Sequence, residues 1–273
     1  MSATDAVQSP DLSTPFELSA QQIEEYRAKG HVMVRGLLSP TEVEHYRQAI
    51  LSAVQRLNRE TRPLEERDTY AKAFLQIMNL WVQDDAVKPL VLSARLGTVA
   101  AQLMGVDRAR LYHDQALFKE AGGGPTPWHQ DQHYWPLDTN NTVTMWMPLI
   151  DADTSMGTMR FASGSQSEGY LGDMPISDES ERMFEEFVAK KGYKIVASGA
   201  MKAGDATFHS GWTLHGAPGN SSNQTREVMT IIYYPDGTKV GSADNANRQA
   251  DLKTWLPGLQ PGELAASPLN PVV

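Results

Sequence analysis

The sequence predicts a mainly β protein with flanking helices, in which short strands form a sandwich or barrel next to an N-terminal helical layer. In the first hundred residues, helix-capping patterns and apolar residues at three- and four-residue steps indicate helices. Beyond residue 106, short segments of alternating polarity are separated by Gly, Pro, Asn and Asp turns. These segments alternate aliphatic side chains with polar and ring-bearing ones, which is typical of a barrel with an open, functional interior.

The amino-acid composition excludes several classes of function. The chain has 273 residues, no cysteine and a formal net charge of −9. Disulfides, thiolate metal sites and cysteine nucleophiles are therefore excluded, and binding to nucleic acid or an anionic membrane is disfavoured. The segment "MSATDAVQSPDLSTPFELS" lacks the basic and apolar regions of a signal peptide, and no apolar run reaches the length of a membrane span. We expect a cytoplasmic protein that acts on a small molecule.

The chain divides into four segments. Residues 1–16 are polar and predict a flexible tail, and residues 17–273 predict a single domain. Within that domain we expect a helical layer over about 17–105 and a β core over about 106–240. A C-terminal extension covers about 241–273.

The helical layer begins with two capping boxes. Ser19 with Gln22 opens "SAQQIEEYRAKG", which Gly30 closes, and Ser39 with Glu42 opens the next helix. Between them, "HVMVRGLL" predicts a short strand. Two further helical stretches, around 69–82 and 93–104, are expected before Gly105.

The predicted strands have two distinct faces. In "ARLYHDQALFKE", one face carries Leu111, His113, Gln115, Leu117 and Lys119, opposite Tyr112, Asp114, Ala116 and Phe118. In "NTVTMWMPLI", Thr142, Thr144 and Trp146 lie opposite Val143, Met145 and Met147. The segments "GDATFHSGWTLHG" and "EVMTIIYYPDG" complete the set, interrupted by a helix near 178–191.

The stretch "PTPWHQDQHYW", residues 125–135, concentrates metal-binding chemistry. On a strand, His129 and Asp131 point to the same side, as two ligands of a 2-His-1-carboxylate iron site do. A surface turn with a hydrogen-bonded aspartate is the alternative. A zinc-protease helix is rejected, because Gln130 stands where that motif needs glutamate and three prolines oppose a helix. The segment "ASGSQS" lacks the spacing of a hydrolase nucleophile elbow.

A second segment supplies the missing partners. His215 offers a third ligand, and Arg226 follows eleven residues later at the start of a strand. An arginine inside a barrel is costly unless it meets an anion, and its planar group fits a carboxylate. Alternatively, His215 is a loop histidine and Arg226 a surface cation. His209 competes as third ligand, but Asn220 stands eleven residues after it.

The order "WHQD", "TMWMPLIDADTSMGTMRFASGSQ", "GDATFHSGWTLHG" and "NQTREVMTIIYY" resembles the phytanoyl-CoA dioxygenase-like branch of the iron(II)/2-oxoglutarate oxygenases. The resemblance spans roughly residues 16–236 and includes the opening helix-strand-helix. It implies a double-stranded β-helix (jelly-roll, cupin-like) core. It also implies Fe(II) as cofactor, with 2-oxoglutarate and dioxygen as co-substrates.

Carried over by position, the resemblance assigns roles to individual residues. His129, Asp131 and His215 would bind iron, and Arg226 would bind the distal carboxylate of 2-oxoglutarate. The co-substrate pocket would include Thr144, Trp146 and Gln115, and substrate contacts would come from Trp135, His133, Lys119 and Trp212. One departure is Ala217, where some relatives have a serine that helps to hold 2-oxoglutarate.

The function that this resemblance implies is a dioxygenase that hydroxylates or desaturates a small metabolite or natural product. It would release succinate and carbon dioxide. The alternative is a non-redox, metal-binding cupin-like protein, such as an isomerase, a lyase or a binding module. Arg226 discriminates between them, because a simple metal binder needs no buried carboxylate clamp.

Overall fold

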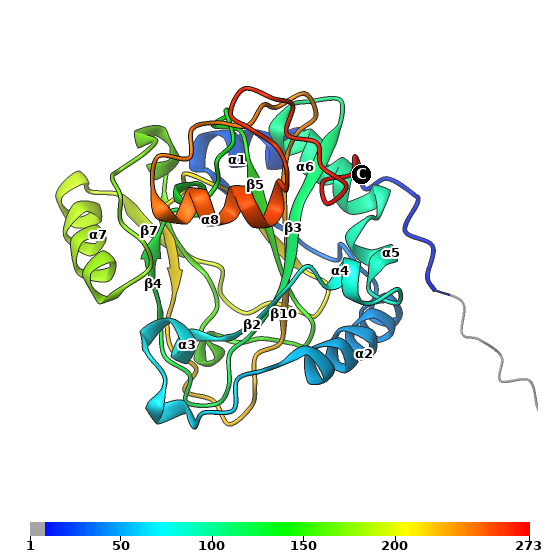
Figure 1. The fold of residues 1–273 in the computed structure, drawn as a ribbon. Helices are drawn as coiled ribbons and strands as arrows, with labels where there is room; N and C mark the ends of the chain where they lie inside the picture. Colours follow the sequence, from blue (N-terminus) through cyan, green and yellow to red (C-terminus); the bar gives the residue numbers. More distant parts are fainter. Residues whose placement is uncertain (1–8) are drawn as a thin grey trace, which may run out of the picture.

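The computed structural model describes residues 9–273; the first eight residues of the predicted tail lie outside this range. Two antiparallel sheets face each other, and helices cover their outer sides (Figure 1). A mainly β fold with flanking helices is thus confirmed. Within residues 9–273, no helix combines the length and the apolar character needed to cross a membrane.

The larger sheet has six strands in the order β1-β8-β5-β10-β3-β2, and the smaller has four in the order β4-β9-β6-β7. The larger sheet is formed by β1 (His31–Val34), β2 (Leu75–Met78), β3 (Ala109–Phe118), β5 (Val143–Pro148), β8 (Ala206–Ser210) and β10 (Val228–Pro235). The smaller sheet is formed by β4 (Thr126–His129), β6 (Arg160–Ser163), β7 (Lys194–Ala197) and β9 (His215–Ala217).

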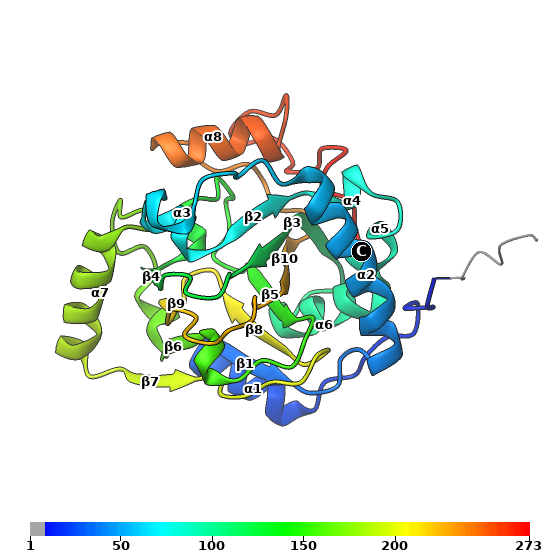
Figure 2. The ribbon, with the colours of Figure 1, turned by 90° about the horizontal axis from the view of Figure 1, so that it is seen from below.

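Helices pack mainly on the outer face of the larger sheet, while α7 lies beside β4 and α8 crosses one end of the sheets (Figures 1 and 2). The α-helices are α1 (Ala20–Lys29), α2 (Pro40–Leu57), α3 (Thr69–Ala73), α4 (Leu80–Gln83), α5 (Lys88–Val91), α6 (Ala94–Met104), α7 (Asp178–Lys191) and α8 (Ala246–Trp255). Short 3-10 turns cover Leu64–Glu66, Asp131–His133, Thr154–Met156 and Ser165–Glu168.

Side-chain alternation on β5 separates the main core from the interior between the sheets. Val143, Met145 and Met147 belong to the core between the larger sheet and the helices. Thr144 and Trp146 point the other way, into a cavity. The predicted two faces of this strand are confirmed, and the polar face is the one that can carry chemistry.

Local capping signals are also confirmed. The Ser19–Gln22 and Ser39–Glu42 boxes form as expected at the starts of α1 and α2. Gly30 and Gly105 end α1 and α6 in left-handed conformations. The helix expected near 178–191 is α7.

The helix expected over 69–82 is wrong. The chain instead forms α3, then β2, then α4, with Asn79 in a left-handed conformation at φ 51°. The stretch Leu75–Met78 pairs with β3 as an edge strand, in the register Gln76 to Leu117 and Met78 to Gln115. Pairing to the sheet edge therefore outweighs the helical preference of this apolar run.

The predicted faces of β3 are wrong at one end. His113 pairs with Ile232 but Leu111 pairs with Tyr233, so Tyr112 is the extra residue of a β-bulge. Leu111 consequently lies in the main core, whereas Tyr112 packs against Trp135 on the interior side. The bulge turns a tyrosine hydroxyl toward α8.

Candidate metal centre

Three side chains from two strands and a turn meet at one end of the interior. His129 ends β4 and His215 begins β9, and the two residues are direct partners in the sheet. Asp131 lies in the 3-10 turn that follows β4. Gly216 permits this close pairing, because a Cβ there would lie 2.8 Å from the carbonyl oxygen of Thr126.

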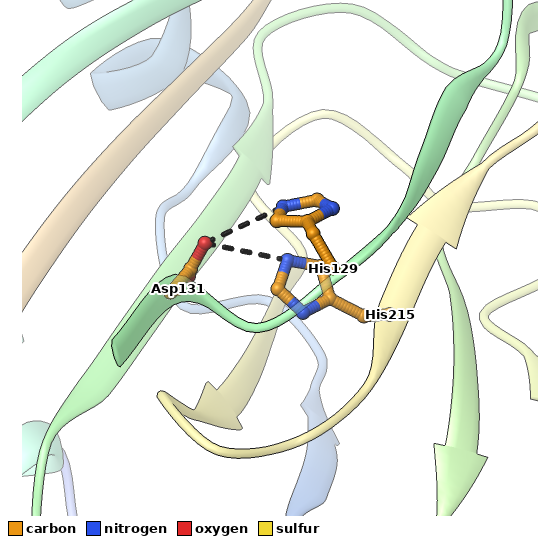
Figure 3. A group of neighbouring side chains, drawn as sticks. All are labelled: His129, Asp131 and His215. Atoms are coloured by element: carbon orange, nitrogen blue, oxygen red, sulfur yellow. Dashed lines mark ion pairs between the residues drawn. The ribbon is translucent and has the colours of Figure 1, made fainter. Parts of the chain in front are cut away.

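The geometry of the three groups fits a single metal ion. The Nε2 atoms of His129 and His215 each lie 3.5 Å from Oδ1 of Asp131, and the three ligand atoms lie within 4.8 Å of one another (Figure 3). Both rings turn Nε2 toward the carboxylate. The predicted trio is therefore brought together, with ligand types that suit iron(II) and leave positions open.

Backbone contacts orient both imidazoles. Nδ1 of His129 lies 2.7 Å from the carbonyl oxygen of Pro127, and Nδ1 of His215 lies 2.9 Å from that of Thr213. A hydrogen on Nδ1 is the one that can donate to these carbonyls, which leaves the Nε2 lone pair for a metal. Burial, followed by the neighbouring rings of His129 and His209, lowers the pKa of His215 well below its usual value, so the ring is neutral.

Asp131 is held as an anion by its neighbours. Burial alone would raise its pKa, but the surrounding imidazoles, His215 before His129 and His209, hold the pKa well below its usual value. Its Oδ2 accepts a hydrogen bond from Thr144 at 2.7 Å and faces Nε2 of His209 at 3.1 Å. Oδ1 is thereby left facing the two histidines.

These contacts separate the roles of the two candidate third ligands. His209 sits on β8 and contacts the outer oxygen of Asp131, whereas His215 faces the inner oxygen. Only His215 satisfies the three-ligand geometry with His129 and Asp131. Thr144, expected in the co-substrate pocket, lines the cavity and positions Asp131.

A cavity of about 280 Å³ opens beside the three ligands. Its wall is contributed by both sheets, by α3 and by α8. The wall includes the predicted residues Gln115, Trp135, Thr144, Trp146 and Arg226, and also Tyr70, Phe74, Gln76, His113, Thr126, Tyr134, Ala217, Asp251, Thr254 and Trp255. The cavity is thus lined mainly by apolar side chains, with a small number of polar and charged groups among them, as in many small-molecule sites.

Arg226 is the cation of this chamber. Its side chain is only 1% exposed, lies over the Trp146 ring at 5.1 Å and donates to the carbonyl oxygen of Gly157. Burial lowers its pKa to about 9. Among residues 9–273, no carboxylate lies within 4 Å of it, and its Nε has no hydrogen-bond partner. A buried guanidinium in this state favours an external anion.

Lys119 places a second buried basic group, an amine, close to the guanidinium of Arg226. The two residues form a mutual pair of backbone hydrogen bonds of 2.9 and 2.8 Å between the ends of β3 and β10. Burial, and then the charge of Arg226, lowers the pKa of Lys119 to about 6. Its Nζ contacts Thr126 at 3.3 Å and the Gly124 carbonyl.

Three residues expected to contact substrate do not line the cavity. Lys119 lies behind Thr126, and Trp212 donates to Asn140 at 2.9 Å. His133 is buried behind the wall, with Nε2 3.2 Å from Asn247 and 3.5 Å from Asp173. The 3-10 turn Asp131–His133 ends the alternation of strand β4, so that His133 lies outside the cavity wall whereas Trp135 lines it.

Two groups on the wall were missed by the sequence reasoning. Thr126 is the direct partner of Ala217, so its hydroxyl lies across from the position where relatives have a serine. Asp251 projects from α8, within the C-terminal extension. Only the register of β4 against β9 could have identified Thr126, and the sequence does not reveal that register.

Two histidines and one carboxylate that could hold one metal ion thus share a cavity with a buried arginine, between two antiparallel sheets. The chain belongs to the phytanoyl-CoA dioxygenase family, whose model matches residues 26–228.

Individual proteins of similar sequence are dioxygenases as well. A probable alpha-ketoglutarate-dependent hypophosphite dioxygenase of Stutzerimonas stutzeri is 26% identical over 226 residues, covering 78% of each chain. Ectoine dioxygenase of Bordetella parapertussis is 22% identical over 238 residues, covering 79% of this chain and 75% of that protein.

The fold is also shared with solved structures. The epimerase SnoN from nogalamycin biosynthesis, in complex with Fe³⁺, alpha ketoglutarate and nogalamycin RO, superposes with a TM-score of 0.75 at 25% identity. That match covers 92% of this chain and 97% of SnoN. The carbocyclase SnoK has the same fold, with a TM-score of 0.78 at 24% identity over 95% and 99% of the two chains.

Proposed function

We propose that this protein is an iron(II)- and 2-oxoglutarate-dependent oxygenase that hydroxylates a small metabolite or natural product. The observation that carries the proposal is one cavity that joins the three candidate ligands to a buried arginine without a protein carboxylate. A metal binder without turnover needs the first feature but not the second.

Iron would be held by Nε2 of His129, Nε2 of His215 and the carboxylate of Asp131. When bound, the metal supplies the dioxygen activation that couples decarboxylation of 2-oxoglutarate to oxidation of a substrate C–H bond. Around it, the chain orients its own ligands: two backbone carbonyls hold the rings, and Thr144 with His209 holds Asp131. Such outer contacts typically tune metal affinity by an order of magnitude or more.

The distal carboxylate of 2-oxoglutarate would be bound by Arg226. We further propose that Thr126 donates the hydrogen bond that a serine provides in some relatives, because its hydroxyl lies across from Ala217. A dianion at this position would favour the charged forms of both Arg226 and Lys119. The departure at Ala217 would then be compensated from the neighbouring strand.

The architecture fits this proposal. The two facing antiparallel sheets would be the two halves of a double-stranded β-helix (jelly-roll), within a single domain that spans residues 17–273. The ligands lie on the smaller sheet and on the turn after it, and Arg226 precedes a strand of the larger sheet. Substrate would therefore meet the metal between the sheets, where side chains exclude most water.

Succinate release provides the test. The protein, loaded with iron(II) without oxygen, is mixed with 2-oxoglutarate, air-saturated buffer and a library of small metabolites, and succinate is quantified by mass spectrometry. We expect succinate that depends on iron(II), with at least one compound that raises its yield and gains one oxygen atom. The His215→Ala variant is the background control. Succinate at the level of this control, with every compound, would refute the proposal.

A further inference from the structure

The cavity wall carries a further carboxylate, that of Asp251, which the proposed chemistry does not use. Asp251 projects from α8 into the chamber, on a wall separate from the metal ligands and from Arg226. In Figure 2, α8 lies across the sheets on the side of α3 and β2, two elements that also contribute to this wall. This helix lies outside residues 26–228, which match the family model.

The surroundings of Asp251 are neutral. The hydroxyl of Tyr112 donates to its Oδ2 at 3.0 Å, and no Lys, Arg or His within residues 9–273 lies within 4 Å of the carboxylate. Burial raises the pKa of Asp251 to about 7, against the hydrogen bonds of Tyr112 and Trp255 that lower it. A carboxylate in this state is stabilised by an incoming cation.

Aromatic rings share this part of the cavity. Trp255 follows Asp251 by one helical turn, and Trp135 packs against Tyr112 at 5.6 Å between ring centroids. Burial raises the pKa of Tyr134, and the negative charges of Asp131 and Asp251 raise it further. Tyr134 therefore lies within the electrostatic reach of both carboxylates. Ring faces together with a carboxylate are the groups that bind ammonium ions in proteins.

We propose that Asp251 determines substrate specificity by binding a protonated amine on the substrate, with the surrounding rings contacting the adjoining apolar part. The chamber is then electrostatically divided: the anionic co-substrate is bound at Arg226, and the cationic end of the substrate at Asp251. An amine held there would place the remainder of the substrate in the space between α8 and the metal ligands. A hydroxyl group would gain one hydrogen bond but would not compensate the carboxylate charge.

This proposal rests on the proposed function only in taking the cavity as the substrate site. The test uses three probes of similar size: 2-phenylethylamine, 2-phenylethanol and 3-phenylpropanoate. Binding of each is measured by calorimetry at pH 8, to metal-free protein and to protein loaded anaerobically with iron(II) and 2-oxoglutarate. We expect the amine to bind more tightly than the alcohol to both forms, and the carboxylate to bind least to the form in which 2-oxoglutarate occupies Arg226.

The Asp251→Asn variant keeps an acceptor for Tyr112 but removes the charge. Its affinity for the amine should fall roughly 10- to 150-fold, the usual range for a charged hydrogen bond, whereas affinity for the alcohol should change little. Asp244→Asn is the matched control, because Asp244 precedes the same helix, is exposed and pairs with Arg248 outside the cavity wall. This control should bind all three probes as the wild type does.

Two results would overturn the proposal, and neither depends on the variant's folding. One is wild-type protein that binds the alcohol as tightly as the amine; the other is no measurable amine binding. A preference for the amine in metal-free protein that Asp251→Asn removes would support the role of Asp251 even if iron(II) and 2-oxoglutarate failed to bind. That failure would instead contradict the proposed function.

Discussion

Replacing Arg226 with methionine should weaken 2-oxoglutarate binding and stabilise the cofactor-free protein. Methionine retains an unbranched apolar side chain but removes a buried charge. Truncating one partner of a buried charged pair costs about 2–5 kcal/mol, which corresponds to roughly a 30- to several-thousand-fold weaker affinity. Iron(II) affinity should change little, because Arg226 contacts none of the three ligands.

The stability effect follows from the empty cavity. Burial lowers the pKa of Arg226 from 12.5 to about 9, which corresponds to roughly 5 kcal/mol of lost solvation at about 1.4 kcal/mol per pH unit. At pH 7.5 the arginine is charged in both the folded and the unfolded chain, so this cost is fully present. The charged hydrogen bond to Gly157 and the contact with Trp146 offset about 2–5 kcal/mol. A net gain of about 0–3 kcal/mol is expected.

The assay has two readouts. Anaerobic titration of the iron(II) protein gives the affinity for 2-oxoglutarate, and thermal unfolding without ligand gives the melting temperature. Arg47→Met is the matched control, because Arg47 forms two hydrogen bonds with Glu227, of 2.6 and 2.8 Å, outside the cavity. The control should lose stability and keep its affinity for 2-oxoglutarate. An unchanged 2-oxoglutarate affinity in Arg226→Met would place the clamp elsewhere, and a melting temperature lowered as in Arg47→Met would refute the electrostatic reasoning.

Four further outcomes are expected. His129→Ala or His215→Ala should abolish iron(II) binding, measured by calorimetry, and leave the circular dichroism spectrum unchanged. His209→Ala should only weaken iron(II) binding, and loss of the metal in this variant alone would identify His209 as the third ligand. Asp131→Gly should lose most turnover and bind azide at the metal, seen as an absorption change, because removing an anionic ligand leaves the metal charge uncompensated; normal turnover without an azide effect would remove Asp131 from the site. Thr126→Val should weaken 2-oxoglutarate binding roughly 10-fold with iron(II) affinity unchanged, and an unaltered titration would exclude the hydroxyl from this role. Affinity for 2-phenylethylamine should rise between pH 6 and 8, because Asp251, with a pKa of about 7, ionises over this range. Burial lowers the pKa of His113 to about 3, so this neighbour stays neutral. An amine affinity that does not change with pH in the wild type would contradict binding of the amine by Asp251.

The grouping of the three candidate metal ligands could be predicted because their order and spacing can be read along the chain. His129 and Asp131 are two residues apart, and the distant His215 and Arg226 stand eleven residues apart in a recognisable order. The helix caps at Ser19 and Ser39 were predictable for the same reason, since a cap is made by residues three positions apart.

Features that depend on strand register could not be predicted. The bulge at Tyr112 leaves the polar alternation of β3 looking regular in the sequence, yet it exchanges the faces of two residues. Thr126 becomes a candidate only once β4 is aligned with β9, so that it stands opposite Ala217. Both consequences arise from pairing between residues about a hundred positions apart.

The contribution of α8 was hidden for a different reason. The apolar side chains of this helix do not gather on one face, and none of its residues is fully buried. It covers the cavity through the partly buried Asp251 and Trp255. A helix whose role is to close a binding site gives little signal of that role in its sequence pattern.

We expect His129, Asp131, His215 and Arg226 to form together one site for iron(II) and 2-oxoglutarate. A crystal structure of the protein grown without oxygen in the presence of both, with anomalous data at the iron edge, tests it most directly. We expect one iron peak within bonding distance of both Nε2 atoms and of Asp131. The distal carboxylate of 2-oxoglutarate should lie in contact with Arg226. An iron peak bonded to His209 instead of His215, or a keto acid whose carboxylate lies away from Arg226, would contradict it.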